Sequence, residues 1–459
     1  MEIRWRRLRR GALACTTVAL VLTTSGCFLQ DPNAGGGGSG GPGGSGFADG
    51  GTADKDKEVT ILGVPGGDEA KGLLASLKTF EDETGIKVKY TSDRDFETTI
   101  KTRVSAGDTP DIGLFPAPGS LLEMAGKGVI QPIDTYLDFD ELDRSLIPGF
   151  LEAVRRNGRV YGVPVKMAVK GLVWYPKAAY TKAGYSTDPK TLTDLTATTD
   201  KIKGSKVSPW CMSWGSDQAT GWVGTDWIED YVLRMYGPDT YDDWVAHRIK
   251  FNDPKIVKAF DEFGKIAKGR GEVYGDAKGV LNTPFADAMN PAFAAGGPKC
   301  MLMHQADFAA TFLPKPVQAD LDNQVGLFVF PQFPGGFAGQ AIVGGGDNAA
   351  LFNGNDPDAI KVMKFLASKE WGKEWAQAGG WLSPHRDFDQ SNYPNETTKR
   401  IAQVASTADV LRFDGSDLMP KEVGSGTFWT GMVEWLQGKS SQQVTTEIEN
   451  SWPAAKSSS

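Results

Sequence analysis

Hydrophobic and polar residues alternate along the chain in blocks of changing period, and the blocks from residue 58 onward predict a β-α-β unit. The apolar run Val59–Val64 predicts a strand. After Asp68, apolar residues return every three or four positions, which predicts one face of a helix that ends at Gly85. Residues 86–90 predict a second strand. Because β-α-β units build parallel sheets, this pattern favours an α/β fold.

The alternation continues toward the C-terminus. Helices are predicted over Asp95–Ser105 and Asp358–Ala378, and a strand is predicted over Ile112–Phe115. A chain of 459 residues exceeds what one ordinary core holds, so we expect two lobes. Extended stretches without helical period at Gly162–Val165 and Pro331–Gly339 are predicted to cross between them.

The N-terminus predicts export and lipid attachment. Five arginines precede the apolar stretch Gly11–Thr24, and small residues lead to Cys27. That stretch is shorter than the roughly 20 residues that span a bilayer. We therefore expect a signal peptide at 1–26, a lipid anchor on Cys27 at the outer face of the cell membrane, and a Gly-rich linker at 27–53. The alternative is an ordinary secreted protein cleaved nearby, because lipoprotein signals usually carry Leu at the position of Thr24.

Composition excludes some function classes. The net charge is −8, and residues 1–26 contribute five arginines and one glutamate, so the remainder carries about −12. An acidic chain argues against a nucleic acid partner and against adsorption to anionic lipid. The three histidines lack metal-ligand spacing, and no phosphate-binding Gly-Lys-Ser/Thr loop occurs. A pair of hydrolytic carboxylates has no fixed spacing, so an exported carbohydrate-active hydrolase stays an alternative.

Two of the four cysteines remain once Cys15 leaves with the signal peptide and Cys27 serves as the anchor. Two cysteines in an oxidising compartment favour one disulfide between Cys211 and Cys300. Two buried free thiols are the alternative.

Several stretches resemble, in order, the extracytoplasmic solute-binding proteins of carbohydrate ABC importers, the group that includes maltose-binding protein. They are Lys78–Val88, Ser105–Ile112, Gly158–Pro164, Val173–Tyr185 and Ser425–Trp429. The resemblance covers most of the body and implies a two-lobed periplasmic-binding-protein fold of type II. Each hinge-linked lobe would have a mixed β-sheet flanked by helices. We expect lobe 1 at about 54–164 plus 335–370, and lobe 2 at about 165–334 plus 371–459.

A narrower resemblance is to the α-glucoside-binding branch, whose ligands include trehalose, sucrose and maltose. Its stretches are Arg94–Phe96, Val165–Tyr175, Trp210–Cys211, Thr220–Trp227 and Lys299–Phe308. Both remaining cysteines fall inside these stretches, which supports the disulfide. The sequence Gln305-Ala306-Asp307-Phe308 departs from the Gly-Ser/Pro-Trp often found in the broader family, and this departure bears on ligand identity.

A sugar site needs aromatic rings for the C–H faces and charged side chains for the hydroxyls. The resemblance and the strand ends nominate five polar or aromatic residues near the first lobe and the hinge: Asp68, Arg94, Asp95, Phe115 and Lys170. Their alternative roles are a helix cap for Asp68, a surface pair for Arg94 and Asp95, a core ring for Phe115 and a solvated lysine for Lys170.

The second lobe and its crossing supply eight further candidates. Four tryptophans lie beside Gly/Pro loops or a family stretch: Trp174, Trp222, Trp381 and Trp429. The polar candidates are Asp226, His304, Asp307 and Asp347. Core packing is the alternative for each tryptophan, a satisfied structural role for the histidine, and capping, turn or surface roles for the aspartates.

These observations predict a monomeric binding protein that closes on an oligosaccharide and delivers it to the transmembrane permease subunits. No catalysis, metal or cofactor is implied. Two rivals stay open, which are the exported hydrolase and a binding protein for a non-sugar solute such as a peptide or polyamine. A hydrolase would consume the sugar, whereas a site for charged solutes would need fixed opposite charges.

Overall fold

The computed structural model describes residues 58–454, apart from the side chain of Asp68. The predicted signal peptide 1–26, the anchor Cys27 and the linker 27–53 lie outside the described residues. The described residues all belong to one compact unit. Among their helices, none combines the length and the apolar character that a bilayer crossing requires.

The first sheet has five strands in the order β2-β1-β3-β13-β6. Strands β1, β2 and β3 run parallel, whereas β13 pairs antiparallel with both β3 and β6. The predicted strands at 59–64, 86–90 and 112–115 are therefore confirmed as three neighbours in one mixed sheet. The bounds are Glu58–Gly63 for β1, Lys87–Ser92 for β2, Ile112–Phe115 for β3, Val163–Pro164 for β6 and Asn348–Leu351 for β13.

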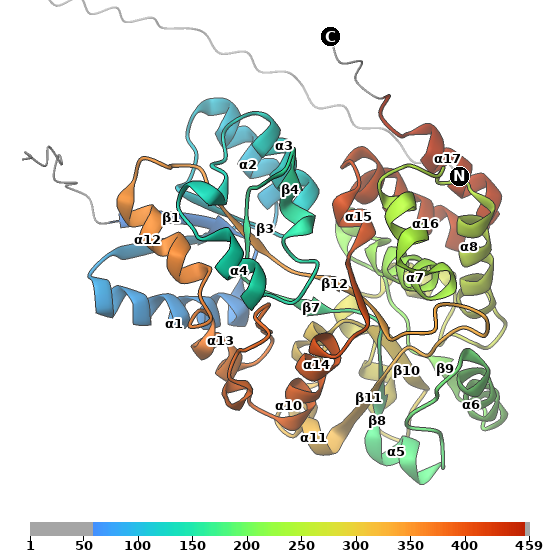
Figure 1. Ribbon diagram of the computed structural model, residues 1–459. Coiled ribbons are helices and arrows are strands. Elements are labelled where there is room, and N and C mark those ends of the chain that lie inside the picture. The colour runs from blue at the N-terminus through green and yellow to red at the C-terminus, as the bar shows by residue number, and fades with distance from the viewer. Residues whose placement is uncertain (1–57, 455–459) are drawn as a thin grey trace, which may run out of the picture. The chain divides into compact units, whose positions relative to one another are not determined.

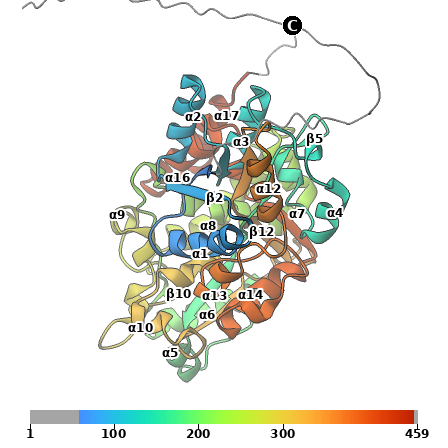
Figure 2. The same ribbon diagram turned by 90° about the vertical axis from the view of Figure 1, so that its left-hand side faces the viewer.

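Helices α1 and α12 flank this sheet, and α13 packs on α1 (Figure 1). The quarter turn of Figure 2 brings α1 and β2 to the front. Helix α1 ends at Gly85, whose left-handed φ of 73° lets its N–H bond the carbonyl of Glu81. Its N-cap is Gly66, so Asp68 lies inside the helix and does not cap it. The helices are α1 (Gly67–Thr84), α2 (Phe96–Ala106), α3 (Pro118–Gly126), α4 (Phe139–Ser145), α12 (Pro357–Leu366) and α13 (Lys373–Ala378).

The helix predicted over Asp358–Ala378 is wrong as one element, because two helices occupy this range. Helix α12 stops at Leu366, and α13 starts only after Gly372, which has a left-handed φ of 81°. Between them the buried Trp371 turns inward and donates its indole N–H to the carbonyl of Val165 over 2.7 Å. A continuous helix would not present that side chain to the same partner.

Two further sheets build the rest of the body. One has the order β11-β8-β10-β9, and the other has the order β14-β12-β7. Parallel and antiparallel pairs occur in both, as the mixed-sheet prediction requires. The bounds are Ala168–Val169 for β7, Leu172–Pro176 for β8, Ser208–Trp210 for β9, Cys300–Gln305 for β10, Val325–Val329 for β11, Ala341–Gly345 for β12 and Val410–Phe413 for β14. The short hairpin β4 (Arg155–Arg156) and β5 (Arg159–Val160) stands apart.

The remaining helices surround these two sheets. Helices α7, α8, α16 and α17 pack on one another, and α14 lies against α11 and β7 (Figure 1). Their bounds are α5 (Lys177–Lys182), α6 (Leu192–Gly204), α7 (Trp222–Val245), α8 (Pro254–Ala267), α9 (Ala277–Asn282), α10 (Lys315–Gln318), α11 (Leu321–Gln324), α14 (Glu396–Ser406), α15 (Gly415–Leu418), α16 (Trp429–Leu436) and α17 (Ser441–Asn450). A π-helix at Glu422–Phe428 leads directly into α16.

The chain passes between the first sheet and the third sheet at two adjacent places. Strand β6 continues into β7 through residues 165–167, and β12 continues into β13 through residues 346–347. The stretch Pro331–Gly339, predicted to be a crossing, does not lead to or from the first sheet. It joins β11 to β12, and the N–H of Phe337 in it bonds the carbonyl of Arg234 in α7 over 2.8 Å. Strand pairing thus puts this passage near Gly346, and the exact lobe boundaries stay a prediction.

The disulfide between Cys211 and Cys300 is confirmed, with a Cα–Cα distance of 5.3 Å. It joins the end of β9 to the start of β10, where the N–H of Cys211 also bonds the carbonyl of Leu302 over 2.7 Å. Both cysteines are buried.

Candidate functional site

The backbone at Val165 is fixed from several directions. Its N–H donates to the carbonyl of Asp347 over 2.9 Å. Its carbonyl accepts two indole N–H groups, from Trp371 at 2.7 Å and from Trp381 at 3.0 Å. A buried carbonyl that uses both lone pairs holds its peptide in one orientation. The side chains that follow it, Lys166 and Lys170, are therefore presented from a defined backbone.

Lys170 lies at the centre of a buried group of charges. Its ammonium bonds Asp226 of α7 over 2.9 Å and Asp414, which caps α15. Glu229, one turn after Asp226, accepts the backbone N–H groups of Gly415 and Ser416. We call Lys170, Asp226, Glu229 and Asp414 the Lys170 cluster.

The three carboxylates and one ammonium of this cluster strongly shift each other's titration. Burial raises the pKa of Asp226 to about 7, with Asp414 adding to the shift and Lys170 opposing it. Burial and Asp414 also raise the pKa of Glu229 well above its usual range. Burial alone would raise the pKa of Asp414, but Lys170 and the hydroxyl of Ser416 outweigh it and lower that pKa. Asp414 is thus the carboxylate that keeps its charge beside Lys170.

Oxygens of Asp226, Glu229 and Asp414 lie within 4.8 Å of one another, a spacing that could hold a metal ion. However, the Lys170 ammonium already bonds two of the three carboxylates and supplies a positive charge. The arrangement is suited to hydroxyl groups, which can both donate to a carboxylate and accept from an ammonium.

A second group of charges gathers around Lys166. Its ammonium bonds Glu69 over 2.7 Å and lies 5.4 Å from the ring centre of Trp375. Burial would lower the pKa of Lys166, but Glu69, Asp347 and Asp307 together raise it. Asp307 accepts the N–H of Val169 over 2.7 Å, and burial raises the pKa of Asp307 to about 6. Burial also raises the pKa of Asp347.

Trp222 brings an aromatic face to the Lys170 cluster. Its ring centre lies 5.9 Å from the Lys170 ammonium, and Phe285 and Phe308 contact it at centroid distances of 5.1 and 6.1 Å. Trp222 is only partly buried, unlike most tryptophans in the described chain. A side chain at Gly221 would collide with the carbonyl of Trp429, so this close approach requires glycine and brings the backbone of α16 against the start of α7.

The structure therefore brings together six of the thirteen predicted contact residues around the passage between the sheets. They are Lys170, Trp222, Asp226, Asp307, Asp347 and Trp429. As ligand contacts they stay predictions. Sequence reasoning missed Glu69, Lys166, Glu229 and Asp414. Lys166 lies inside the stretch that resembles the α-glucoside branch, and the turn composition of Asp414-Gly415-Ser416-Asp417 was the available signal for Asp414.

Four predicted residues lie in the core and have partners there. Phe115 packs edge-on to Phe96, and Trp174 donates its indole N–H to the carbonyl of Gln305. Trp381 bonds the carbonyl of Val165. The ring of His304 stacks on that of Trp227 at 4.1 Å, and its Nε2 lies 3.1 Å from Asp230. These positions match the structural alternatives that the sequence left open.

Two predicted residues lie outside both charged groups, and the side chain of a third is not described. Arg94 and Asp95 are exposed, and Asp95 forms the N-cap position of α2 without a side-chain bond to it. The side chain of Asp68 is outside the described residues.

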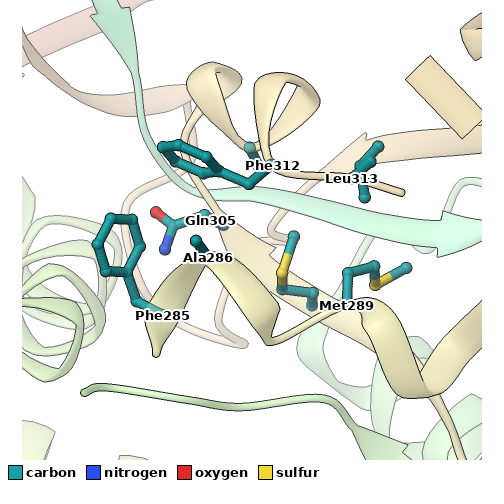
Figure 3. Close-up of a pocket in the computed structure, with 8 residues that line it drawn as sticks. Phe285, Ala286, Met289, Gln305, Phe312 and Leu313 are labelled. Atoms are coloured by element: carbon teal, nitrogen blue, oxygen red, sulfur yellow. The ribbon is translucent and has the colours of Figure 1, made fainter. Parts of the chain in front are cut away.

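A small hollow lies between β10 and the segments around it, with an empty volume of about 200 Å³. Figure 3 shows Phe285, Met289 and Phe312 around it, with Gln305 as its one labelled polar side chain. Its lining contains none of the charged residues that hold Lys166 or Lys170. We therefore do not place the site there.

Comparison with known proteins gives a consistent result. The model of the bacterial extracellular solute-binding proteins matches residues 66–373. The chain is 39% identical over 397 residues to the osmoprotective compounds-binding protein GgtB of Synechocystis sp., covering 86% of this chain and 93% of that protein. It is 34% identical over 416 residues to the alpha-glucosides-binding periplasmic protein AglE of Rhizobium meliloti, covering 88% of each.

The structure of maltose-bound MalE3 of T. maritima superimposes with a TM-score of 0.64 at 19% identity, covering 86% of this chain and 98% of that chain. At this identity the likeness concerns the fold alone. It confirms the two-lobed, maltose-binding-like α/β fold that the sequence predicted.

Proposed function

The chain belongs to the bacterial extracellular solute-binding proteins, and on that premise we propose that it captures an α-glucoside and delivers it to an ABC importer. Trehalose, sucrose, maltose and maltooligosaccharides are the candidate ligands. The supporting relative is the alpha-glucosides-binding protein, which is 34% identical over nearly the whole length of both chains. The osmoprotective compounds-binding relative extends the candidates to other small compatible solutes.

The chemistry around Lys166 and Lys170 carries the proposal. Sugar hydroxyls pair with ammonium and carboxylate groups, and the apolar face of a sugar ring stacks on an aromatic side chain. Lys170, Asp226 and the partly exposed Trp222 supply these three elements within one contact network. Closure around a ligand would exclude water and strengthen these hydrogen bonds. The closed form would then be the state that the permease subunits recognise.

A cationic solute is the second candidate, because carboxylates outnumber ammonium groups in this region. Seven carboxylates act on two lysines: Glu69, Asp226, Glu229, Asp307, Asp347, Asp414 and Asp417 on Lys166 and Lys170. A polyamine would supply the missing positive charge. The pKa of Asp226, raised to about 7, and the raised pKa values of Glu229 and Asp347 favour the neutral sugar, since protonation already removes part of the excess.

Thermal shift of the full chain, purified in detergent, tests the proposal against disaccharides, maltooligosaccharides and polyamines. A ligand at 100 times its Kd should stabilise the protein by about 2.7 kcal/mol. A shift with one α-glucoside class, with the sugar recovered intact, would support the binding function over hydrolysis. A shift with polyamines alone would refute the sugar assignment.

We also propose that Cys27 carries the lipid and that the protein acts as a monomer. Metabolic labelling with a fatty acid should mark the wild-type protein but not Cys27→Ala. Light scattering of the body should give the mass of one chain with and without ligand. Release of unlabelled wild-type protein into the medium would instead support the secreted alternative.

A further inference from the structure

We propose that Glu97, Ser120 and Asp417 form a hydroxyl-reading subsite beside the Lys170 cluster, and this inference rests on the proposed sugar-binding function. Glu97 lies in the first turn of α2, Ser120 in α3 and Asp417 in α15. The subsite would bind vicinal hydroxyls of the ligand through the two carboxylates.

The helices that carry these residues approach each other closely. A Cβ atom at Gly119 would lie 3.0 Å from the carbonyl oxygen of Asp417 and 3.1 Å from that of Met419. Helix α3 follows a strand of the first sheet, whereas α15 follows β14 of the third sheet. The contact therefore joins elements from the two sides of the passage through Val165 and Gly346. A ligand held between these elements would touch both sides at once.

Polar groups at this contact lack partners. Both carboxylate oxygens of Glu97 are inaccessible to solvent, and neither accepts a hydrogen bond within the described residues. The Ser120 hydroxyl is in the same state, and Ser120 as a whole is 8% exposed. It lies close enough to Glu97 to favour the charged form of that carboxylate as a donor, but the pair does not reach full hydrogen-bond geometry. Because buried polar groups are nearly always hydrogen-bonded, these atoms indicate a partner that the polypeptide itself does not supply.

Asp417 extends the group toward the Lys170 cluster. Its backbone N–H donates to Asp414 over 3.0 Å, and the opposite carboxylate oxygen of Asp414 binds Lys170. Asp417 itself is only partly buried, so its carboxylate stays open to a ligand. The subsite is thus continuous with the residues that surround Trp222.

The charges around these residues favour a neutral donor. Burial raises the pKa of Glu97, and Glu123 adds to the shift while Ser120, Lys421 and Lys101 oppose it. Burial, Asp414, Asp226 and Glu97 raise the pKa of Asp417 against the effect of Lys170. Each carboxylate therefore disfavours ionisation of the other. Hydroxyl donors can bond carboxyl groups in either protonation state, so a sugar fits this pair without adding charge.

Calorimetry with the full chain and its best α-glucoside tests the subsite. Glu97→Gln and Asp417→Asn should each weaken binding by about tenfold or more, because hydrogen bonds to carboxylates are among the stronger ones. Ser120→Ala should weaken it less. Glu152→Gln is the control, since Glu152 pairs at the surface with Arg155 and is not among the charges that act on Glu97 or Asp417, and it should change the affinity by less than about twofold.

Monodeoxy analogues of the sugar separate hydroxyl reading from a general effect on closure. For wild type, removing the hydroxyl that Glu97 contacts should weaken binding, and Glu97→Gln should lose most of that penalty at this one position. Two results would overturn the subsite while the sugar-binding function stands. One is an unchanged penalty at every position in both carboxylate variants, and the other is carboxylate variants that bind as well as Glu152→Gln. Wild-type binding of spermidine but of no sugar would overturn both. Melting curves establish that each variant folds, and Ser120→Ala provides the test if either carboxylate variant does not.

Discussion

Removing the bond between Cys211 and Cys300 should destabilise the folded chain by about 4–5 kcal/mol. The bond spans a sequence separation of 89 residues. Crosslinking a loop of that length removes unfolded-state entropy equivalent to about 4.6 kcal/mol at 25 °C. With an unfolding entropy of about 2.1 cal/mol/K per residue over about 400 residues, this loss lowers Tm by about 5 °C. Because both cysteines are buried, replacing them by alanine adds a small packing loss to this value.

Calorimetric melting of wild type and of the double variant Cys211→Ala/Cys300→Ala measures the effect. Wild type treated with a reductant should shift toward the variant, whereas the variant itself should not respond to the reductant. Thiol titration in denaturant provides the control that wild type starts fully oxidised. If oxidised wild type without free thiols melts within about 1 °C of the double variant, the loop-entropy reasoning is refuted.

Three further predictions concern a buried histidine, a glycine of the passage between the sheets and the Lys170 ion pairs. Burial lowers the pKa of His385 to about 4, so the unfolded chain binds more protons than the folded chain between pH 6.5 and 4, and about 3 kcal/mol of stability should be lost as pH falls through that window. In urea titrations His385→Asn should abolish this loss, and an unchanged dependence of stability on pH would contradict the prediction. A side chain at Gly346 would collide with the carbonyl of Lys166, so Gly346→Ala should lower Tm far more than Gly335→Ala, where the added atom meets open space. Equal falls in Tm for the two variants would contradict this prediction. Lys170→Met leaves two buried carboxylates without their cation, so it should lower the free energy of unfolding by about 3–5 kcal/mol at pH 7 and by less at pH 5. Urea titrations at both pH values measure this, and an equal loss at the two would contradict the role of the ion pairs.

The first β-α-β unit could be predicted because its signals are local. The apolar run of β1, the helical period of α1 and the left-handed Gly85 each act within a few residues. The break between α12 and α13 was not local in this sense. The sequence from 358 to 378 has a helical period throughout. The helix is interrupted because the indole of Trp371 bonds the carbonyl of Val165, which is distant in the sequence.

The candidate site shows the same division. The amino-acid sequence specifies which residue types are available, and it nominated Lys170, Trp222 and Asp226 from their resemblance to a family. Folding in three dimensions brings Lys170 to Asp414, 244 positions away, and leaves Arg94 exposed. An aspartate on the surface and one that binds a buried ammonium have identical chemistry in the sequence. What separates them is the local dielectric and the partner, and both arise only when distant segments pack together.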